Sequence, residues 1–211
     1  MLFKKINPLL EKALNKQEIK QLTPLQEKII PLFKSGANLL VIAPSNTGKT
    51  TSLLMGVIQK LKAKAVGDNP KVLIYVKDKE SAMTLEEKFK PLLKQTDLRL
   101  YTVIEEHHIY NQKDNIYIGT DIVIATPRRL NKLYFQNGIN LNELNTIIVE
   151  DANFLKNNSF ITDINRVVQS APKTQRIVFA EKEGAEIQRA KDLFLEPVRE
   201  VTFLQKDSEL S

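Results

Sequence analysis

Short, fully apolar runs alternate with segments of helical periodicity along most of the chain. Leu39–Ala43 and Val72–Val76 are apolar at every position, which is typical of strands buried on both faces. The segments between them, such as Lys79–Leu93, repeat apolar residues at helical spacing. This alternation predicts a mostly parallel sheet of about seven strands with helices on both faces, and ligands at the carboxyl ends of the strands. The predicted strands are Leu39–Ala43, Val72–Val76, Leu98–Ile104, Ile122–Ala125, Thr146–Glu150, Arg176–Ala180 and Val198–Phe203, and the predicted helices are Asn7–Leu14, Thr23–Phe33, Thr50–Lys62, Lys79–Leu93, Pro127–Phe135, Thr162–Ser170 and Ala185–Leu195.

The chain length of 211 residues suits one α/β domain and is short for two. Three polar segments interrupt the pattern, and we expect them to be exposed: Lys64–Pro70, His107–Asn115 and Gln205–Ser211. The net charge of +6 favours a polyanionic partner such as nucleic acid, although a lysine-rich surface explains the charge equally well. No cysteine is present and no apolar run reaches membrane-spanning length, so we expect a cytoplasmic protein without a membrane partner.

The segment Ala43–Thr50 has the features of a phosphate-binding loop between a strand and a helix. Its backbone N–H groups would surround phosphate oxygens, Lys49 would reach the outer phosphates, and the Thr50 hydroxyl would meet magnesium. Ala43 replaces the usual first glycine of such loops, and a chance Gly-Lys-Thr in an ordinary loop is the alternative interpretation. The nucleotide-binding residues predicted here are Ser45, Asn46, Thr47, Gly48, Lys49, Thr50 and Thr51.

From Phe3 to Phe203 the chain resembles the first RecA-like domain of the DEAD-box RNA helicases. The segment Thr23–Gln26 is similar to the end of the family's Q motif, which implies that Gln26 reads the adenine edge and that Phe3 packs on the base. The alternative is that Thr23 and Gln26 only form a helix-capping box. The resemblance implies a three-layer RecA-like phosphate-loop domain over residues 1–205, with the Q-motif region at 1–36 and a polar tail or linker start at 206–211.

Two further segments resemble the RNA-binding motifs of the family. Lys79 stands where the family has an arginine that touches the RNA backbone, and Thr126-Pro127-Arg128-Arg129 is similar to its Thr-Pro-Gly-Arg segment. The resemblance implies RNA contacts from Lys79, Thr126, Arg128 and Arg129. For Thr126 and Pro127, a helix cap and first helical residue are the alternative. Between these segments Glu105-Glu106 replaces a paired glycine, and two carboxylates there would repel phosphate.

The largest departure from the family follows the predicted strand Thr146–Glu150. The family's Asp-Glu-Ala-Asp is here Glu150-Asp151-Ala152-Asn153, so the first two acids have exchanged lengths. The resemblance implies that Glu150 holds Mg²⁺ with Thr50, and that Asp151 activates water beside Glu150 and Lys49. Aspartate is shorter than glutamate by one carbon–carbon bond of about 1.5 Å, and a misplacement of about 1 Å can cost on the order of a hundredfold in rate.

Two more differences lead us to expect weak hydrolysis of ATP or none. The family's Ser-Ala-Thr, which couples hydrolysis to strand separation, is replaced by Ala180-Glu181-Lys182. The family's second RecA-like domain supplies arginine fingers, and the resemblance covers only the first domain. The leading hypothesis is therefore an ATP- and RNA-binding helicase domain, and the second is a catalytically silent platform for RNA or a protein partner. An unrelated phosphate-loop kinase fits the loop but not the spacing of Gln26, Arg129 and Glu150.

Overall fold

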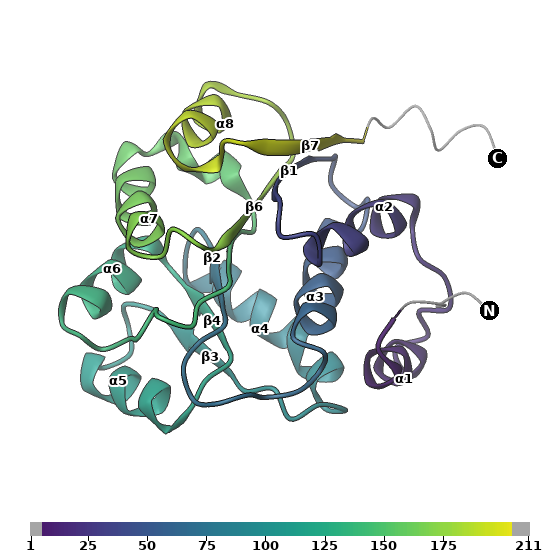
Figure 1. Ribbon diagram of the computed structural model, residues 1–211, viewed down its shortest axis with the longest axis horizontal. Helices are drawn as coiled ribbons and strands as arrows, with labels where there is room; N and C mark the ends of the chain where they lie inside the picture. Colours follow the sequence, from purple (N-terminus) through teal and green to yellow (C-terminus); the bar gives the residue numbers. More distant parts are fainter. Residues whose placement is uncertain (1–5, 204–211) are drawn as a thin grey trace.

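A computed structural model describes residues 6–203, which form one parallel sheet between two layers of helices (Figure 1). All seven strands pair in parallel in the order β3-β4-β2-β5-β6-β1-β7, which confirms the predicted fold class. The strands are β1 (Asn38–Ile42), β2 (Val72–Tyr75), β3 (Leu100–Val103), β4 (Ile122–Ala125), β5 (Thr146–Val149), β6 (Gln175–Ala180) and β7 (Val198–Thr202). The α-helices are α1 (Pro8–Lys16), α2 (Pro24–Phe33), α3 (Lys49–Lys60), α4 (Lys79–Leu93), α5 (Ile109–Ile118), α6 (Pro127–Phe135), α7 (Asn158–Ser170) and α8 (Ala185–Ala190).

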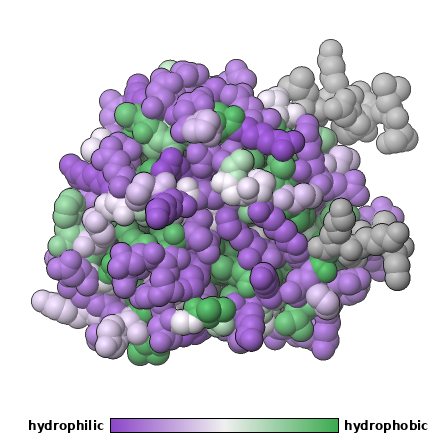
Figure 2. Space-filling view, in the orientation of Figure 1, coloured by the Kyte–Doolittle hydropathy of each residue, from purple (hydrophilic) through white to green (hydrophobic). Residues whose placement is uncertain are grey.

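Each face of the sheet carries its own hydrophobic core. Helices α1 to α4 pack on one face, where Leu39 and Val41 of β1 contribute to the core. Helices α5 to α8 pack on the other face, where the alternate residues Leu40 and Ile42 contribute (Figure 1). Strands buried on both faces must be apolar at every position, which explains the continuous runs in the sequence. The outer surface in the same view is mostly hydrophilic, with hydrophobic residues in small separate groups (Figure 2). Among residues 6–203, no helix has both the length and the apolar character needed to span a bilayer.

Polar side chains fix the starts of several helices. Asn7 accepts a hydrogen bond from the backbone N–H of Leu9 at 2.9 Å, at the start of α1. Asp78 accepts a hydrogen bond from the backbone N–H of Ser81 at 2.9 Å, at the start of α4. This bond and a second one from the Ser81 hydroxyl hold the pKa of Asp78 below its ordinary value. Such caps satisfy backbone donors that have no partner within the helix, so local sequence sets where the helix begins.

Beyond shifts of one or two residues at element ends, the structure departs from the predicted elements in four places. Helix α7 begins at Asn158, four residues before the predicted start at Thr162. The segment His107–Asn115, predicted to be exposed, is mostly exposed but lies largely in α5, a helix that was not predicted, and its Gln112 is buried. The predicted helix Ala185–Leu195 is α-helical only to Ala190 and ends in a wider π-type turn. A short 3-10 helix, Ala152–Lys156, follows β5 where no element was predicted. Helix α5 was missed because its buried residues are few and one of them is the polar Gln112, so its apolar periodicity is weak.

The sheet order divides the carboxyl edge into two groups of neighbouring strands. Strand β1 lies between β6 and β7, with Leu40 opposite Val178 on one side and Glu200 on the other. Strands β1, β6 and β5 are therefore adjacent, and they lead into the phosphate loop, Glu181 and the acids Glu150 and Asp151. Strands β2, β4 and β3 form the other group, and they lead into the predicted RNA-binding segments.

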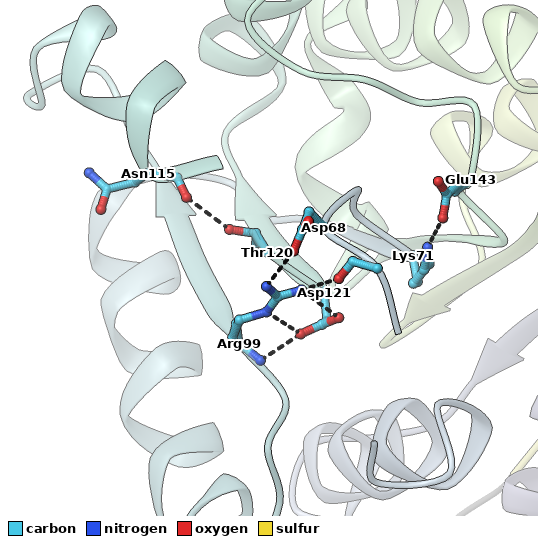
Figure 3. A network of polar contacts seen from close by, with 8 residues as sticks. Asp68, Lys71, Arg99, Asn115, Thr120, Asp121 and Glu143 are labelled. Carbon is cyan, nitrogen blue, oxygen red and sulfur yellow. Dashed lines mark hydrogen bonds and ion pairs between the residues drawn. The ribbon is translucent and has the colours of Figure 1, made fainter. Parts of the chain in front are cut away.

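A network of charged residues lies at the amino ends of β3 and β4, opposite the carboxyl ends that lead into the phosphate loop (Figure 3). Asp121, which is only 1% exposed, accepts bonds from Arg99 Nε at 3.0 Å and from the Arg99 backbone N–H at 2.8 Å. The bond to Asp121 raises the pKa of Arg99, and Asp68 adds a second ion pair at 3.0 Å. Gly119 has φ +129°, and a Cβ at this position would come within 1.9 Å of Arg99 Nη1, so only glycine fits here.

Candidate nucleotide and nucleic-acid site

The phosphate loop connects β1 to α3, as the sequence predicts. Gly48 precedes α3 with φ +90°, and a Cβ there would lie 2.8 Å from Gln26 Nε2, so both backbone conformation and space require glycine. The Lys49 ammonium donates to the carbonyl oxygens of Ala43 and Pro44 within the loop, the latter at 2.9 Å. Binding a phosphate would therefore exchange carbonyl partners of Lys49 for phosphate oxygens.

The remaining loop residues are held by short local bonds. Thr47 donates its hydroxyl to the carbonyl oxygen of Pro44 at 2.8 Å, and Asn46 has φ +63°. Ser45 is exposed and donates its hydroxyl to Glu181 at 2.8 Å. Thr51 lies in the first turn of α3 and is partly buried. The structure thus collects the predicted loop residues at the end of β1 and the start of α3.

Thr50 and Glu150 lie together although 100 positions separate them in the sequence. The Thr50 hydroxyl donates to Glu150 Oε1 at 3.4 Å. Burial raises the pKa of Glu150, and the neighbouring charge of Asp151 adds to this effect. Two oxygen ligands suit Mg²⁺, which usually keeps several waters and takes one or two protein carboxylates. In residues 6–203 no group of three or more acidic, histidine or cysteine side chains could hold a metal ion. A site at Thr50 and Glu150 would therefore take its other ligands from water and phosphate.

Asp151 is turned toward its own loop. Its carboxylate accepts a hydrogen bond from the backbone N–H of Asn153 at 3.1 Å and caps the short helix Ala152–Lys156. Asn153 in turn accepts a bond from the backbone N–H of Glu181 at 2.8 Å and donates to the carbonyl oxygen of Lys182 at 3.3 Å. The acidic segment after β5 and the segment after β6 are therefore fastened to each other.

Gln26 forms the capping box that the sequence left open as an alternative to adenine recognition. Its side-chain oxygen accepts from the backbone N–H of Thr23 at 2.9 Å, and Thr23 Oγ1 accepts from the backbone N–H of Gln26 at 3.3 Å. Gln26 is 4% exposed, while the Thr23 hydroxyl donates to the carbonyl oxygen of Thr47 at 3.2 Å. The cap is thus present and ties the Q-motif region to the phosphate loop. Phe3 lies outside the described residues.

Two of the predicted RNA-binding residues are paired with the acids that replace the family's glycines. Thr126 donates its hydroxyl to Glu105 at 2.7 Å. Lys79 lies 3.9 Å from Glu106, with both side chains about half exposed, so this pair contributes little energy. The two acids therefore lie directly against the expected phosphate-binding positions.

The paired arginines point in different directions. Arg128 is exposed at the start of α6. Arg129 is 7% exposed, and its guanidinium donates to Gln112 Oε1 at 2.7 Å and to the carbonyl oxygen of His107. In this arrangement Arg129 holds α5 against α6, whereas Arg128 is free to meet a ligand from solvent.

The residues that sequence reasoning missed are Glu181, Gln112 and Lys88. Lys88 lines a cavity of about 220 Å³ together with Thr50 and Glu150, and its charge acts on Glu150. A lysine in α4, nine positions after Lys79, gave no such signal, because only the fold brings α4 beside the phosphate loop. At Glu181 the sequence indicates only a loss of hydroxyls, and its position directly after β6, the neighbour of β1, is the signal for a place beside the loop.

Comparisons with known proteins show which sequences and structures this chain is similar to. Residues 23–180 match the family model described as DEAD/DEAH box helicase. The probable ATP-dependent RNA helicase ddx27 of Dictyostelium discoideum is 30% identical over 200 residues, which cover 91% of this chain and 25% of that protein. The ATP-dependent RNA helicase CshA of Listeria monocytogenes is 27% identical over 185 residues, which cover 87% of this chain and 35% of that protein. The chain thus spans about a third or less of the length of these relatives.

Solved structures show the same fold. A DEAD box protein from Methanococcus jannaschii matches with a TM-score of 0.84 at 20% identity, over 93% of this chain and 54% of that one. The yeast DEAD-box splicing factor Prp28 matches with a TM-score of 0.84 at 17% identity, over 96% of this chain and 50% of that one. At these identities the likeness establishes the fold alone.

Proposed function

Because this chain belongs to the DEAD/DEAH box helicase family, we propose that it binds ATP with Mg²⁺ at the phosphate loop, contacts RNA at the ends of β2 and β4, and hydrolyses ATP weakly or not at all. Residues 1–205 are its first RecA-like domain in this proposal. Membership of the family implies ATP and RNA binding. The assignment of particular residues and the weak hydrolysis are the parts proposed here.

The contact between Thr50 and Glu150 carries the nucleotide assignment. A hydroxyl at the start of α3 and a carboxylate at the end of β5 meet at 3.4 Å, beside Lys49 and the backbone N–H groups at the start of α3. When bound, Mg²⁺ would be held by Thr50 and Glu150 and would neutralise charge on the outer phosphates. Lys49 would bind the same phosphates, and Asp151 would orient the attacking water.

The geometry of Asp151 supports weak hydrolysis. The short carboxylate caps its own turn at Asn153 through one oxygen. It is also one carbon–carbon bond, about 1.5 Å, shorter than the family's glutamate. A catalytic group displaced by about 1 Å can lose on the order of a hundredfold in rate, so the exchange of Glu150 and Asp151 suits a slow enzyme.

A catalytically silent binding module is the second candidate. It is favoured by the bonds of Thr126 to Glu105 and of Lys79 to Glu106, which place negative charge on the expected RNA surface. In this reading the fold is a platform for RNA or for a protein partner. The intact Gly48-Lys49-Thr50 and its contact with Glu150 favour the nucleotide-binding function.

We expect Lys49→Ala to weaken binding of a fluorescent ATP analogue in the presence of Mg²⁺ by about tenfold. The reason is that Lys49 is the charged donor of the loop, and a charge-assisted bond to phosphate contributes about 1.5–3 kcal/mol. Fluorescence titration of parent and variant measures the two affinities. Lys60→Ala is unsuitable as a control because that lysine is largely buried, so Lys12→Ala on α1, an exposed lysine, is the matched control.

Indistinguishable titration curves for parent and Lys49→Ala would exclude the loop as the phosphate site. The same titration with Gln26→Ala separates the two roles left open for Gln26. If Gln26→Ala lowers the affinity for the ATP analogue more than the affinity for a GTP analogue, adenine recognition is supported. An equal loss of affinity for both leaves Gln26 as a helix cap only.

For RNA, we expect Lys79→Ala with Arg128→Ala to weaken binding of a single strand and to flatten its salt dependence. Each lost phosphate contact lowers the slope of log affinity against log salt by about 0.7, so the pair should lower it by about 1.4. Arg129 is left in place because its guanidinium bonds to α5. Binding measured by fluorescence anisotropy at several salt concentrations gives both quantities.

Lys12→Ala again serves as the control, since it removes an exposed positive charge from α1, which carries none of the predicted RNA-binding residues. Unchanged affinity and slope in the double variant would show that RNA does not bind at this surface. An equal loss in the control would show that only net charge matters.

A further inference from the structure

Glu181 enters the phosphate loop from the neighbouring strand. It is the first residue after β6, which pairs with β1 directly before the loop. One carboxylate oxygen accepts a hydrogen bond from the Ser45 hydroxyl at 2.8 Å, and its backbone N–H donates to Asn153 at 2.8 Å. Main chain and side chain are thus both hydrogen-bonded, which places the exposed carboxylate against the loop.

The charge of Glu181 acts on Lys49. Burial lowers the pKa of Lys49, and Glu181 opposes this more strongly than any other acid, ahead of Asp151 and Glu150. The hydrogen bond from Ser45 is the main cause that holds the pKa of Glu181 below its ordinary value, so the carboxylate is charged at neutral pH. Lys49 therefore has an anionic neighbour before any phosphate arrives.

A phosphate bound at the loop would lie on the same segment as this carboxylate, because Glu181 bonds to Ser45 of the loop. Lys49 and the N–H groups at the start of α3 attract phosphate oxygens, and a carboxylate beside them repels the same oxygens. The repulsion grows with the negative charge of the ligand and with its proximity to Ser45 and Lys49. ATP carries one more phosphate and more charge than ADP, so Glu181 disfavours ATP more than ADP.

We propose that Glu181 is a specificity-determining residue whose carboxylate, bonded to Ser45 of the loop, repels the terminal phosphate of ATP and shifts the nucleotide preference of this site toward ADP. The inference rests on the nucleotide function proposed above. It differs from that function because it concerns the ratio of two affinities and not the presence of a site. It also gives the segment Ala180-Glu181-Lys182 a role of its own in place of the lost hydroxyls.

The test uses Glu181→Gln in the 211-residue chain. Glutamine has the same shape and can still accept the hydrogen bond from Ser45, so only the charge is removed. Glu183→Gln removes an equal charge two residues later, from an exposed side chain that lines the separate cavity between β1 and α8. Affinities for fluorescent ATP and ADP are measured for the parent and both variants with Mg²⁺ present.

The expected result is that Glu181→Gln strengthens ATP binding relative to ADP about tenfold, while Glu183→Gln changes the ratio by less than about twofold. Added salt should reduce the preference of the parent for ADP, because the competing charge is exposed. An unchanged ratio in Glu181→Gln, with both nucleotides bound, overturns the inference and leaves the proposed function intact. An equal change in Glu183→Gln also overturns it, and failure of every chain to bind nucleotide overturns both.

Discussion

Replacing Asp121 with alanine is expected to lower the free energy of unfolding by about 2–4 kcal/mol. The carboxylate is almost fully buried and accepts bonds from Arg99 Nε, from Nη2 at 3.3 Å and from the Arg99 backbone N–H (Figure 3). Removal of one partner of a buried pair leaves the other without compensation and typically costs 3–5 kcal/mol, and the partial exposure of Arg99 reduces this figure. Urea unfolding followed by circular dichroism measures the change.

Asp68→Ala is the matched control, because it removes a second carboxylate from the same guanidinium. The Asp68 side chain is 72% exposed, so its ion pair with Arg99 should contribute less than about 1 kcal/mol. Equal losses in the two variants would refute the central place given to Asp121. This network lies at the amino ends of the strands and the phosphate loop at the carboxyl ends. Under conditions in which Asp121→Ala is folded, its nucleotide affinity should therefore equal that of the parent.

The double substitution Glu150→Asp with Asp151→Glu is expected to raise the rate of ATP hydrolysis tenfold or more. It restores the family's order of acids and extends the second side chain by about 1.5 Å, toward the water that the base must orient. A positional error of about 1 Å accounts for up to a hundredfold in rate, which sets the upper end of the expected gain. Phosphate release in the presence of RNA measures the rate. Parent and variant are compared as the same 211-residue chain, so they differ only in the two acids.

The two single variants serve as controls for this exchange. Asp151→Glu alone should recover most of the gain if reach is limiting, and Glu150→Asp alone should not. The double substitution also removes the cap that Asp151 gives to the turn at Asn153. The melting temperature of each variant should therefore be measured alongside the rate. An unchanged rate in the double variant, with nucleotide affinity intact, would show that the acid order does not limit hydrolysis.

The strands could be predicted from sequence because their environment leaves a direct signature. Strand β4 (Ile122–Ala125) was predicted with its observed bounds, since a strand buried on both faces must be apolar throughout. Helices α4 and α6 were also predicted with their observed bounds, because Asp78 and Thr126-Pro127 mark their starts. Burial and capping are local signals, and they survive in a single sequence.

Helix α5 left no such signature. Tyr110, Tyr117 and Ile118 are exposed at 65%, 90% and 76%, while Gln112 is buried, so the usual relation between polarity and burial is inverted. Besides the buried Ile116, the helix is held by Gln112, which donates to the carbonyl oxygen of Ile104 at 2.7 Å and accepts from Arg129. These contacts depend on the fold and cannot be derived from periodicity.

The candidate site was predictable in its parts and not in its pairings. Lys49, Thr50 and Glu150 were identified from motif and resemblance, and the structure brings them together. The bonds of Glu105 to Thr126 and of Glu181 to Ser45 were not predicted. Each joins residues on different strands or loops, and a sequence without a fold does not specify which acid meets which hydroxyl.

The position of β1 between β6 and β7 has a consequence for synthesis on the ribosome. Leu40 pairs with Val178, so the first strand has no sheet partner until β6 has been translated. At about 5–20 residues per second, the roughly 140 intervening residues take on the order of ten seconds or more. During this interval the apolar segment Leu39–Ile42 can pack on α2 and α3 but lacks both of its sheet partners. The phosphate loop that follows it can take shape only near the end of translation of this domain.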